Sequence, residues 1–412
     1  MNLPLWSVLP FVALLLSIAI LPLAVPHFWE PNKNKAIISC IFGLPVGIYF
    51  IFANPRYLMH IEHEYFSFIV LLGTLFIISG GIFLRGDIQA TPINNSIFLL
   101  IGSILASFIG TTGAAMLLIR AVLNINKQRK HICHTVIFFI FCVANIGGCL
   151  TPLGDPPLFL GYLKGVPFSW TFQLLPEWLF MNVILIVLYF IIDAIMIKRE
   201  RKKDLLRDEM TIEPIRVIGG INFIFLLGVI LTVAFIPMTP WRELIMFLLV
   251  GLSLKLSSRE ARTANKFTFS PIIEVAVLFF GIFLAMMPAL VILSERGASL
   301  GLMSPAQFFW CTGSLSSFLD NAPTYAVFFE LAKAVGGGVG ELVAGVPEEL
   351  LRAISIGAVF MGANTYIGNG PNFMVKAISE EAGVKMPSFF GYMLWSGCIL
   401  IPLFVVVTFI FF

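Results

Sequence analysis

Long apolar runs recur along the whole chain and restrict what it can fold into. Residues 7–25, 66–84, 172–197, 218–236 and 272–293 are each close to the roughly 20 apolar residues needed to cross the hydrocarbon core of a bilayer. Only 12% of the 412 residues are charged, compared with about 25% in a soluble domain. No soluble domain fits between the runs. The sequence therefore predicts an all-α polytopic membrane protein.

The order of apolar and polar segments predicts two repeats of one plan. Each repeat has three spans, a re-entrant hairpin, a broken helix and a final span, so each half crosses the bilayer five times. An odd number of crossings gives the halves opposite orientations, which is the inverted-repeat plan of many secondary transporters. We expect a first inverted repeat, a cytoplasmic basic linker and a second inverted repeat at 1–200, 201–216 and 217–412. Spans are expected near 5–25, 36–53, 65–84, 172–197, 217–236, 242–256, 270–294 and 388–411, with hairpins at 96–124 and 305–334 and broken helices at 132–163 and 350–380.

Two motifs recur in the same order in both halves, about 210 positions apart. Residues 102–111 share a Gly-Ser pair and a following Ser-Phe with residues 313–321. Residues 151–159 and 365–373 share the pattern T-x-[LI]-G-[DN]-x-P-x-F. Two matches in order at nearly one offset indicate a duplicated unit.

The basic residues predict the orientation, because cytoplasmic loops collect Lys and Arg. With the hairpins as re-entrant segments, 20 of the 26 Lys and Arg residues fall on one side. Both termini are then external, the first hairpin enters from the cytoplasm, and the second enters from outside. We expect a multi-pass protein of a bacterial inner (plasma) membrane. Its expected partners are membrane lipid and a small ion or anion, with no nucleic acid and with a homodimer left open.

Polar residues gather where the apolar helices break. Irregular backbone at membrane depth persists only where it is buried or lines a wet cavity. Side-chain oxygens and freed carbonyls there suit a hard cation, whereas the amino ends of half-helices suit an anion. The candidate ion- or substrate-binding residues, which would hold sodium, are Thr111, Thr112, Asn145, Thr151, Asp155, Asp320, Asn321, Asn364, Thr365, Asn369 and Asn372.

Two carboxylates stand out, Asp155 and Asp320, one in the motif of each half. An acid at bilayer depth is costly unless it is paired or ligated, so each is a candidate for function and for proton coupling. The alternative is that each only caps a short helix. Glu274 is a third proton-coupling candidate, or else an interfacial helix cap. Asp193 is expected to pair with the basic run that starts at Lys198.

Other reaction types lack support in the sequence. His60, Glu62, His63 and Glu64 could hold a metal, but they fall in a predicted external loop without a recognisable ligand motif. There is no Walker motif, no HExxH and no nucleophile elbow. We therefore expect no enzyme activity and no cofactor, only transported Na+ and H+.

The motifs resemble those of the ion transporter superfamily, which includes citrate and dicarboxylate carriers, arsenite permeases and NhaD-type sodium/proton antiporters. Residues 317–323 look like the S-x-x-x-D-N-x-P tip of the NhaD and arsenite branches, and 151–155 are similar to the NhaD-type T-P-[IL]-G-D stretch. Glu274 before the phenylalanine-rich segment 278–281 is similar to an acid in those branches. The Ser-Asn-Thr tips of dicarboxylate carriers are absent, and Pro156-Pro157 replaces the usual NhaD threonines.

This resemblance implies that paired hairpin tips and adjacent helix breaks form the sodium and substrate sites. Here these would be 110–113 with 145–155, and 320–323 with 364–372. We expect secondary active transport by alternating access, with sodium/proton antiport first. The alternative is a sodium- or proton-coupled carrier of organic or inorganic anions, of the citrate, dicarboxylate or arsenite kind. A channel is disfavoured, because breaks that enter from both sides suit alternating access better than a continuous pore.

Overall fold

The computed structural model describes residues 3–210, 212–336 and 341–412, and most of them are helical. This confirms the predicted all-α polytopic class. In the first half the helices are α1 (Leu9–Ala24), α2 (Pro26–Trp29), α3 (Asn32–Ala53), α4 (Pro55–Ser79), α5 (Pro92–Ile109), α6 (Thr111–Ile125), α7 (Cys133–Cys142), α8 (Pro156–Leu163) and α9 (Leu175–Met196). The basic linker contains α10 (Lys202–Met210).

The second half contains the remaining helices. They are α11 (Ile221–Phe235), α12 (Pro240–Leu256), α13 (Arg259–Ala264), α14 (Ser270–Ala285), α15 (Met287–Arg296), α16 (Pro305–Phe318), α17 (Asn321–Val335), α18 (Glu348–Met361), α19 (Gly370–Glu381) and α20 (Phe389–Phe411). Short 3₁₀ turns cover Leu5–Val8, Ile146–Cys149, Phe168–Leu174, Ile197–Arg199, Gly297–Leu300 and Gly362–Asn364.

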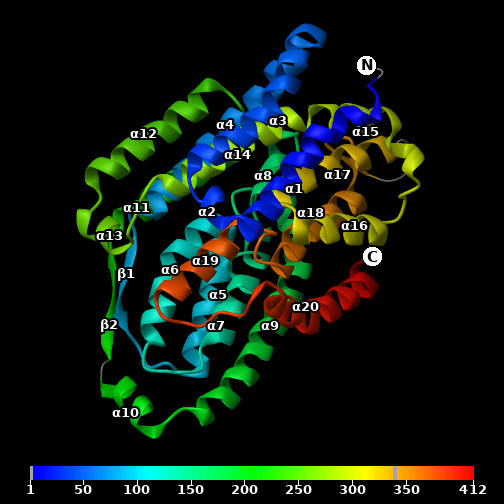
Figure 1. The fold of residues 1–412 in the computed structure, drawn as a ribbon. Helices are drawn as coiled ribbons and strands as arrows, with labels where there is room; N and C mark the ends of the chain where they lie inside the picture. Colours follow the sequence, from blue (N-terminus) through cyan, green and yellow to red (C-terminus); the bar gives the residue numbers. More distant parts are fainter. Residues whose placement is uncertain (1–2, 211, 337–340) are drawn as a thin grey trace.

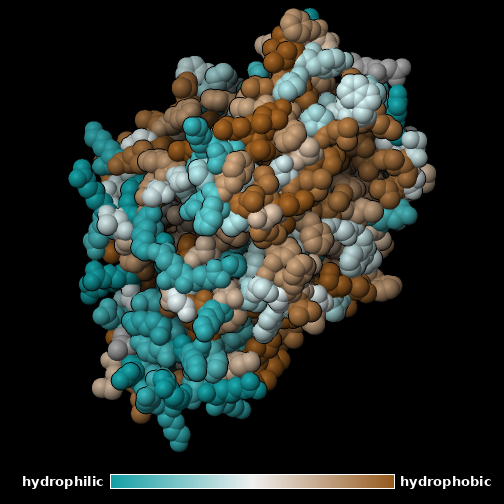
Figure 2. Space-filling model, in the orientation of Figure 1, coloured by the Kyte–Doolittle hydropathy of each residue, from teal (hydrophilic) through white to brown (hydrophobic). Residues whose placement is uncertain are grey.

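Six helical segments in the described residues are long and apolar enough to cross a membrane, or seven if α14 and α15 form one bent span. Their outward faces are apolar, and Figure 2 shows hydrophobic side chains covering α1, α15 and α16. Hydrophilic side chains gather at the opposite lower left, over α10 and its surroundings. An apolar belt with a polar end is the surface expected of a helical protein in a bilayer.

Helices of the first half pack directly on helices of the second half. Helix α3 of the first half packs on α14 of the second, and α12 of the second half packs on α4 of the first. Nearer the centre, α6 packs on α19 while α8 packs on α17 (Figure 1). Each pair joins one hairpin or span of one half to an element of the other, so a rigid-body motion between the halves would rearrange these contacts.

One predicted span starts at a different residue, and another is bent. Helix α4 begins at Pro55, not near residue 65, because the Asn54 side chain caps the Tyr57 amide at 3.1 Å and proline suits the first helical position. His60 and Glu64 are therefore helical and not in a loop. The span expected at 270–294 bends by 42° between α14 and α15, where Pro288 cannot donate a helical hydrogen bond.

The linker expected at 201–216 is more structured than its basic composition indicated. Strand β2 (Glu213–Ile218) pairs antiparallel with β1 (Phe83–Asp87), with Phe83 opposite Ile218. The ribbon lies along one edge of the molecule beside α13 (Figure 1). A smaller ribbon pairs β3 (Leu342–Val343) with β4 (Val346–Pro347). Neither was predicted: Gly86 and Pro214 disfavour β1 and β2, and β4 contains Pro347.

Candidate functional site

Both predicted hairpins reverse at a polar break. In the first, α5 ends at Ile109 and α6 starts at Thr111, with Gly110 between them at φ 81°, a conformation that favours glycine. In the second, α16 ends at Phe318 and Asp320 caps α17, accepting a hydrogen bond from the Ala322 amide at 3.1 Å. The amino ends of α6 and α17 thus begin at the two tips.

The predicted broken helices are interrupted in the same way. After α7 the chain makes a 3₁₀ turn and then an irregular stretch before α8, and α18 and α19 are separated alike. A Cβ on Gly154 would lie 2.2 Å from the Gly148 carbonyl oxygen, and one on Gly368 would lie 2.6 Å from that of Gly362. Only glycine allows the backbone to approach itself this closely, which explains why both motifs carry it.

In each hairpin, hydrogen bonds of one serine connect the hairpin tip to the helix break that follows it in the chain. The Thr151 hydroxyl donates to the Ser107 carbonyl, and the Ser107 hydroxyl donates to the Gly147 carbonyl. In the second half the Thr365 hydroxyl donates to the Ser317 carbonyl at 2.5 Å, and the Ser317 hydroxyl donates to a helix carbonyl. The recurring sequence motifs therefore form recurring hydrogen bonds.

Asp155 lies at the junction of the two halves and is 1% exposed. One carboxylate oxygen accepts hydrogen bonds from the Thr111 hydroxyl at 2.8 Å and the Asn369 amide at 3.0 Å. The other accepts from the Asn321 amide at 2.5 Å. Thr111 belongs to the first half, whereas Asn321 and Asn369 belong to the second. One buried carboxylate therefore joins both hairpin tips and the second break.

Asparagine side chains extend this network. The Asn145 amide donates to the Asn372 side-chain oxygen at 2.7 Å, and its own oxygen accepts from Asn369 at 3.3 Å. The Asn372 amide donates to the carbonyls of Gly362 and Thr365 at 2.8 and 2.9 Å. Asn372 thus holds the unwound carbonyls of its own break, and Asn145 of the first break contacts both Asn372 and Asn369.

Asp320 lines a small cavity of about 90 Å³ beside this network. Thr111, Thr112 and Asn369 line it as well, and α4 and α14 supply apolar walls that include Phe76 and Phe279. Its lining contains no Lys, Arg or His, and no ion pair of Asp155 or Asp320 is found among the described residues. Two carboxylates without a basic partner favour a cation as the missing charge.

Two amide oxygens strengthen this interpretation. The side-chain oxygens of Asn321 and Asn364 are buried and have no hydrogen-bond partner in the described part of the chain. A buried acceptor without a partner costs about 1–3 kcal/mol. Carboxylate and amide oxygens are the ligands that hard cations prefer. The residues present therefore include the kind of oxygen ligands that a hard cation takes.

The structure brings most predicted site residues together. Thr111, Asn145, Asn321, Asn369 and Asn372 form the network around Asp155. Thr151, Asn364 and Thr365 hold the hairpin backbone, the Asn364 amide donating to the Ser317 hydroxyl at 2.9 Å. Thr112 contributes only to the cavity lining. Ser107 and Ser317 were missed as site residues, although both stand in the repeated motifs.

Two acidic residues have partners that the sequence did not indicate. Glu274 forms an ion pair with Lys35 at 2.7 Å and is not part of the cavity lining, so its role in proton coupling stays a prediction. Asp193 pairs with Arg129 at 2.5 Å and with His134 at 2.8 Å, and not with the basic run from Lys198. Arg129 precedes α7 and His134 lies in its first turn, and α7 packs on α9.

Comparison with known proteins identifies the family. The family model described as putative citrate transport matches residues 1–412, the whole chain. No curated protein matches the sequence. The family is one of transporters and not of enzymes, which agrees with a polytopic fold whose polar residues meet at helix breaks. The chain therefore belongs to this citrate-transport family of membrane transporters.

Proposed function

We propose that the protein is a sodium/proton antiporter of a bacterial inner membrane, nearest in mechanism to the NhaD-type antiporters. The observation that carries this proposal is the pair of carboxylates, Asp155 and Asp320, at the junction of the two halves without a basic partner. Na+ and H+ can each neutralise such a group. Competition for one site is enough for exchange, because the site then crosses loaded with one ion or the other.

The two halves act as inverted repeats in this proposal. Asp155 is held by Thr111 from one half and by Asn321 and Asn369 from the other, so a rocking motion between halves changes its surroundings. Asp320 faces the adjacent cavity and is the entry carboxylate. Asn321, Asn364, Thr111 and Thr365 supply neutral oxygens. Such sites near the midplane, at repeat interfaces, are typical of secondary transporters.

The ion pairs support the predicted sides of the membrane. Lys35, Arg85, Lys127 and Lys266, all expected in the cytoplasm, pair with Glu274, Glu260, Asp87 and Glu381. Lys164, Arg242 and Arg352, all expected outside, pair with Glu330, Glu243 and Glu177. By the same predicted topology, the acid of each pair falls on the side of its base.

A second candidate is coupled uptake of citrate or a related carboxylate anion, and the family description favours it. The amino ends of α6, α8, α17 and α19 all start at the breaks and could attract an anion. Against it, the cavity beside Asp320 has no basic side chain in its lining, and a tricarboxylate there would face the Asp320 carboxylate. Sodium/proton exchange therefore stays first.

The test uses purified protein in liposomes that contain a pH-sensitive dye. An acid-inside pH gradient should collapse when Na+ or Li+ is added outside, and should persist with K+ at the same concentration. Empty liposomes and liposomes with Asp155→Asn protein serve as controls. No response to Na+ or Li+, together with accumulation of labelled citrate, would establish the anion carrier instead.

A further inference from the structure

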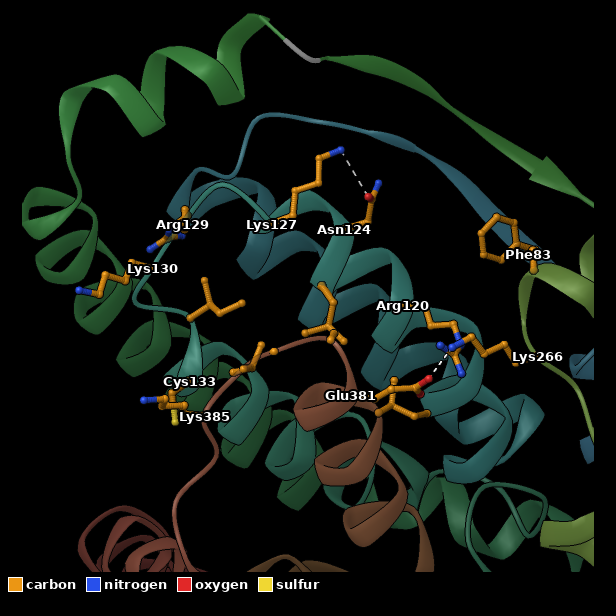
Figure 3. A pocket seen from close by; sticks show the side chains of 17 residues that line it. Phe83, Arg120, Asn124, Lys127, Arg129, Lys130, Cys133, Lys266, Glu381 and Lys385 are labelled. Atoms are coloured by element: carbon orange, nitrogen blue, oxygen red, sulfur yellow. Dashed lines mark hydrogen bonds and ion pairs between the residues drawn. The ribbon is translucent and has the colours of Figure 1, made fainter.

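A basic basin of about 810 Å³ lies apart from the ion site. Its charged lining comprises Arg120, Lys127, Lys130, Lys266, Lys385 and Glu381, together with the Arg129 that is already paired with Asp193. It is of the size of a small-molecule site. Figure 3 shows these side chains around the hollow, from α6, the loop before α7, the segment between α13 and α14, the end of α19 and the loop after it.

Several of these bases have acidic partners, and others do not. Lys127 pairs with Asp87 at 2.8 Å, and Lys266 pairs with Glu381. The ammonium of Lys266, and more weakly the charge of Arg120, holds the pKa of Glu381 below its usual value. No ion pair of Arg120, Lys130 or Lys385 is found among the described residues. The basin therefore carries a positive excess.

The preference of cytoplasmic loops for basic residues explains why this end is basic, but not why Arg120 lies there. Arg120 stands inside α6, more than a turn before the helix ends, and it is partly buried. Figure 3 shows its guanidinium directed toward Lys266 and Glu381, so two cations share one carboxylate. One carboxylate does not balance two cations, and a cleft wall with an excess of one charge attracts counter-ions of the other.

The basin is connected to the ion site by two helices. Helix α6 begins at Thr111 and α19 begins after Asn369, the two residues that donate to the same oxygen of Asp155. The two helices pack on each other and both end at the basin. Arg120 is nine residues from Thr111, or about 14 Å along the helix. Contacts across the basin therefore join the carboxyl ends of α6 and α19, whose amino ends lie at the ion site.

We propose that the basin binds a multivalent anion with two or more phosphate or carboxylate groups, which bridges α6 to the α19–α20 loop. The anion places its charges between Arg120 and Lys130 of the first half and Lys385 of the second. Binding stabilises the packing of α6 on α19 and thus the arrangement of the halves seen here. The proposal does not depend on which ion is exchanged at Asp155.

The test measures thermal unfolding of the full chain in detergent, titrated with inorganic pyrophosphate or citrate at constant ionic strength set by chloride. The midpoint should rise with saturable dependence on at least one of the two. In the double variant Arg120→Gln/Lys385→Gln the apparent affinity should fall about tenfold or more, since charge-assisted contacts are lost. Lys333→Gln, which changes an exposed base on α17 outside the basin, should keep the wild-type response.

A parallel arm distinguishes a free anion from a lipid headgroup. Nanodiscs with anionic phosphatidylglycerol are compared with zwitterionic ones, again for wild type and double variant. Stabilisation by the anionic lipid that disappears in the double variant assigns the headgroup as the source. If neither soluble anion nor anionic lipid stabilises the wild type, or if the double variant responds like the wild type, the basin is not an anion site. Because the readout is unfolding, its failure is independent of transport activity.

Discussion

Asp155→Asn is the substitution that separates the charge of the site from its shape. The amide has the size of the carboxylate and keeps one acceptor for the Thr111 hydroxyl and the Asn369 amide. Its NH₂ group would face the Asn321 amide, now 2.5 Å away. The Asn321 oxygen has no partner, so rotating that amide by half a turn turns the clash into a hydrogen bond.

The substitution weakens hydrogen bonds and removes a buried charge, and these two effects on the free energy of unfolding nearly cancel. Hydrogen bonds to a charged group contribute about 1.5–3 kcal/mol each, and three are weakened to neutral strength. Burying the carboxylate costs several kcal/mol in real proteins, and this cost disappears. We therefore expect the free energy of unfolding to change by less than about 2 kcal/mol, in either direction.

The effect on the transported cation is not compensated. A unit charge about 4 Å away at an effective dielectric constant of 20 contributes about 4 kcal/mol, which is roughly a thousandfold in affinity. The variant also has no proton to release. Sodium-dependent collapse of the pH gradient should therefore be lost while the thermal midpoint stays close to that of the wild type. A well-folded Asp155→Asn protein that exchanges at the wild-type rate would refute the role of this carboxylate.

Three further results are expected. Asp320→Asn keeps the helix cap on α17, because asparagine caps as well as aspartate. Its free energy of unfolding should stay within about 0.5 kcal/mol of the wild type, yet exchange should be lost. Normal exchange would mean that Asp320 is only a helix cap. Gly154→Ala, whose Cβ would meet the backbone at 2.2 Å, should destabilise the protein by several kcal/mol in a denaturation assay. The control is Gly251→Ala on α12, where a Cβ has nothing within 4 Å, and it should be neutral or stabilising by up to about 1 kcal/mol. Lys203→Cys should react with an impermeant thiol reagent only from the cytoplasm and Lys333→Cys only from outside; labelling of both from one side would contradict the inverted orientation.

Much of the fold could be predicted because membrane helices are recognised in a sequence by their length and apolarity. The residue ranges of α3, α9, α12 and α20 agree with the expected spans within a few residues. The failures have physical causes. Asn54 and Pro55 start a helix inside a segment that is polar enough to resemble a loop. The β1–β2 ribbon pairs residues 126 to 135 positions apart, and local patterns carry no information on such pairing.

The candidate site could be predicted because its polar residues and glycines interrupt segments that are otherwise apolar. Polar residues and glycines inside apolar runs are costly unless buried together, which is why Thr111, Asn321 and Asn369 were found from type and spacing alone. That all three donate to Asp155, and that Asp320 instead faces the cavity, depends on how the halves pack. The partners of Glu274 and Asp193 were out of reach for the same reason, since Lys35 and Arg129 are distant in sequence.

The central claim is that Na+ and H+ compete for one pair of carboxylates. It is tested most directly by adding Na+ to purified wild-type protein in weakly buffered detergent solution and measuring the pH. Binding of Na+ should release protons in a saturable manner, K+ should release none at the same concentration, and the variants Asp155→Asn and Asp320→Asn should release fewer. The absence of sodium-dependent proton release from folded wild-type protein, or release of equal size from a variant that combines Asp155→Asn with Asp320→Asn, would contradict the account.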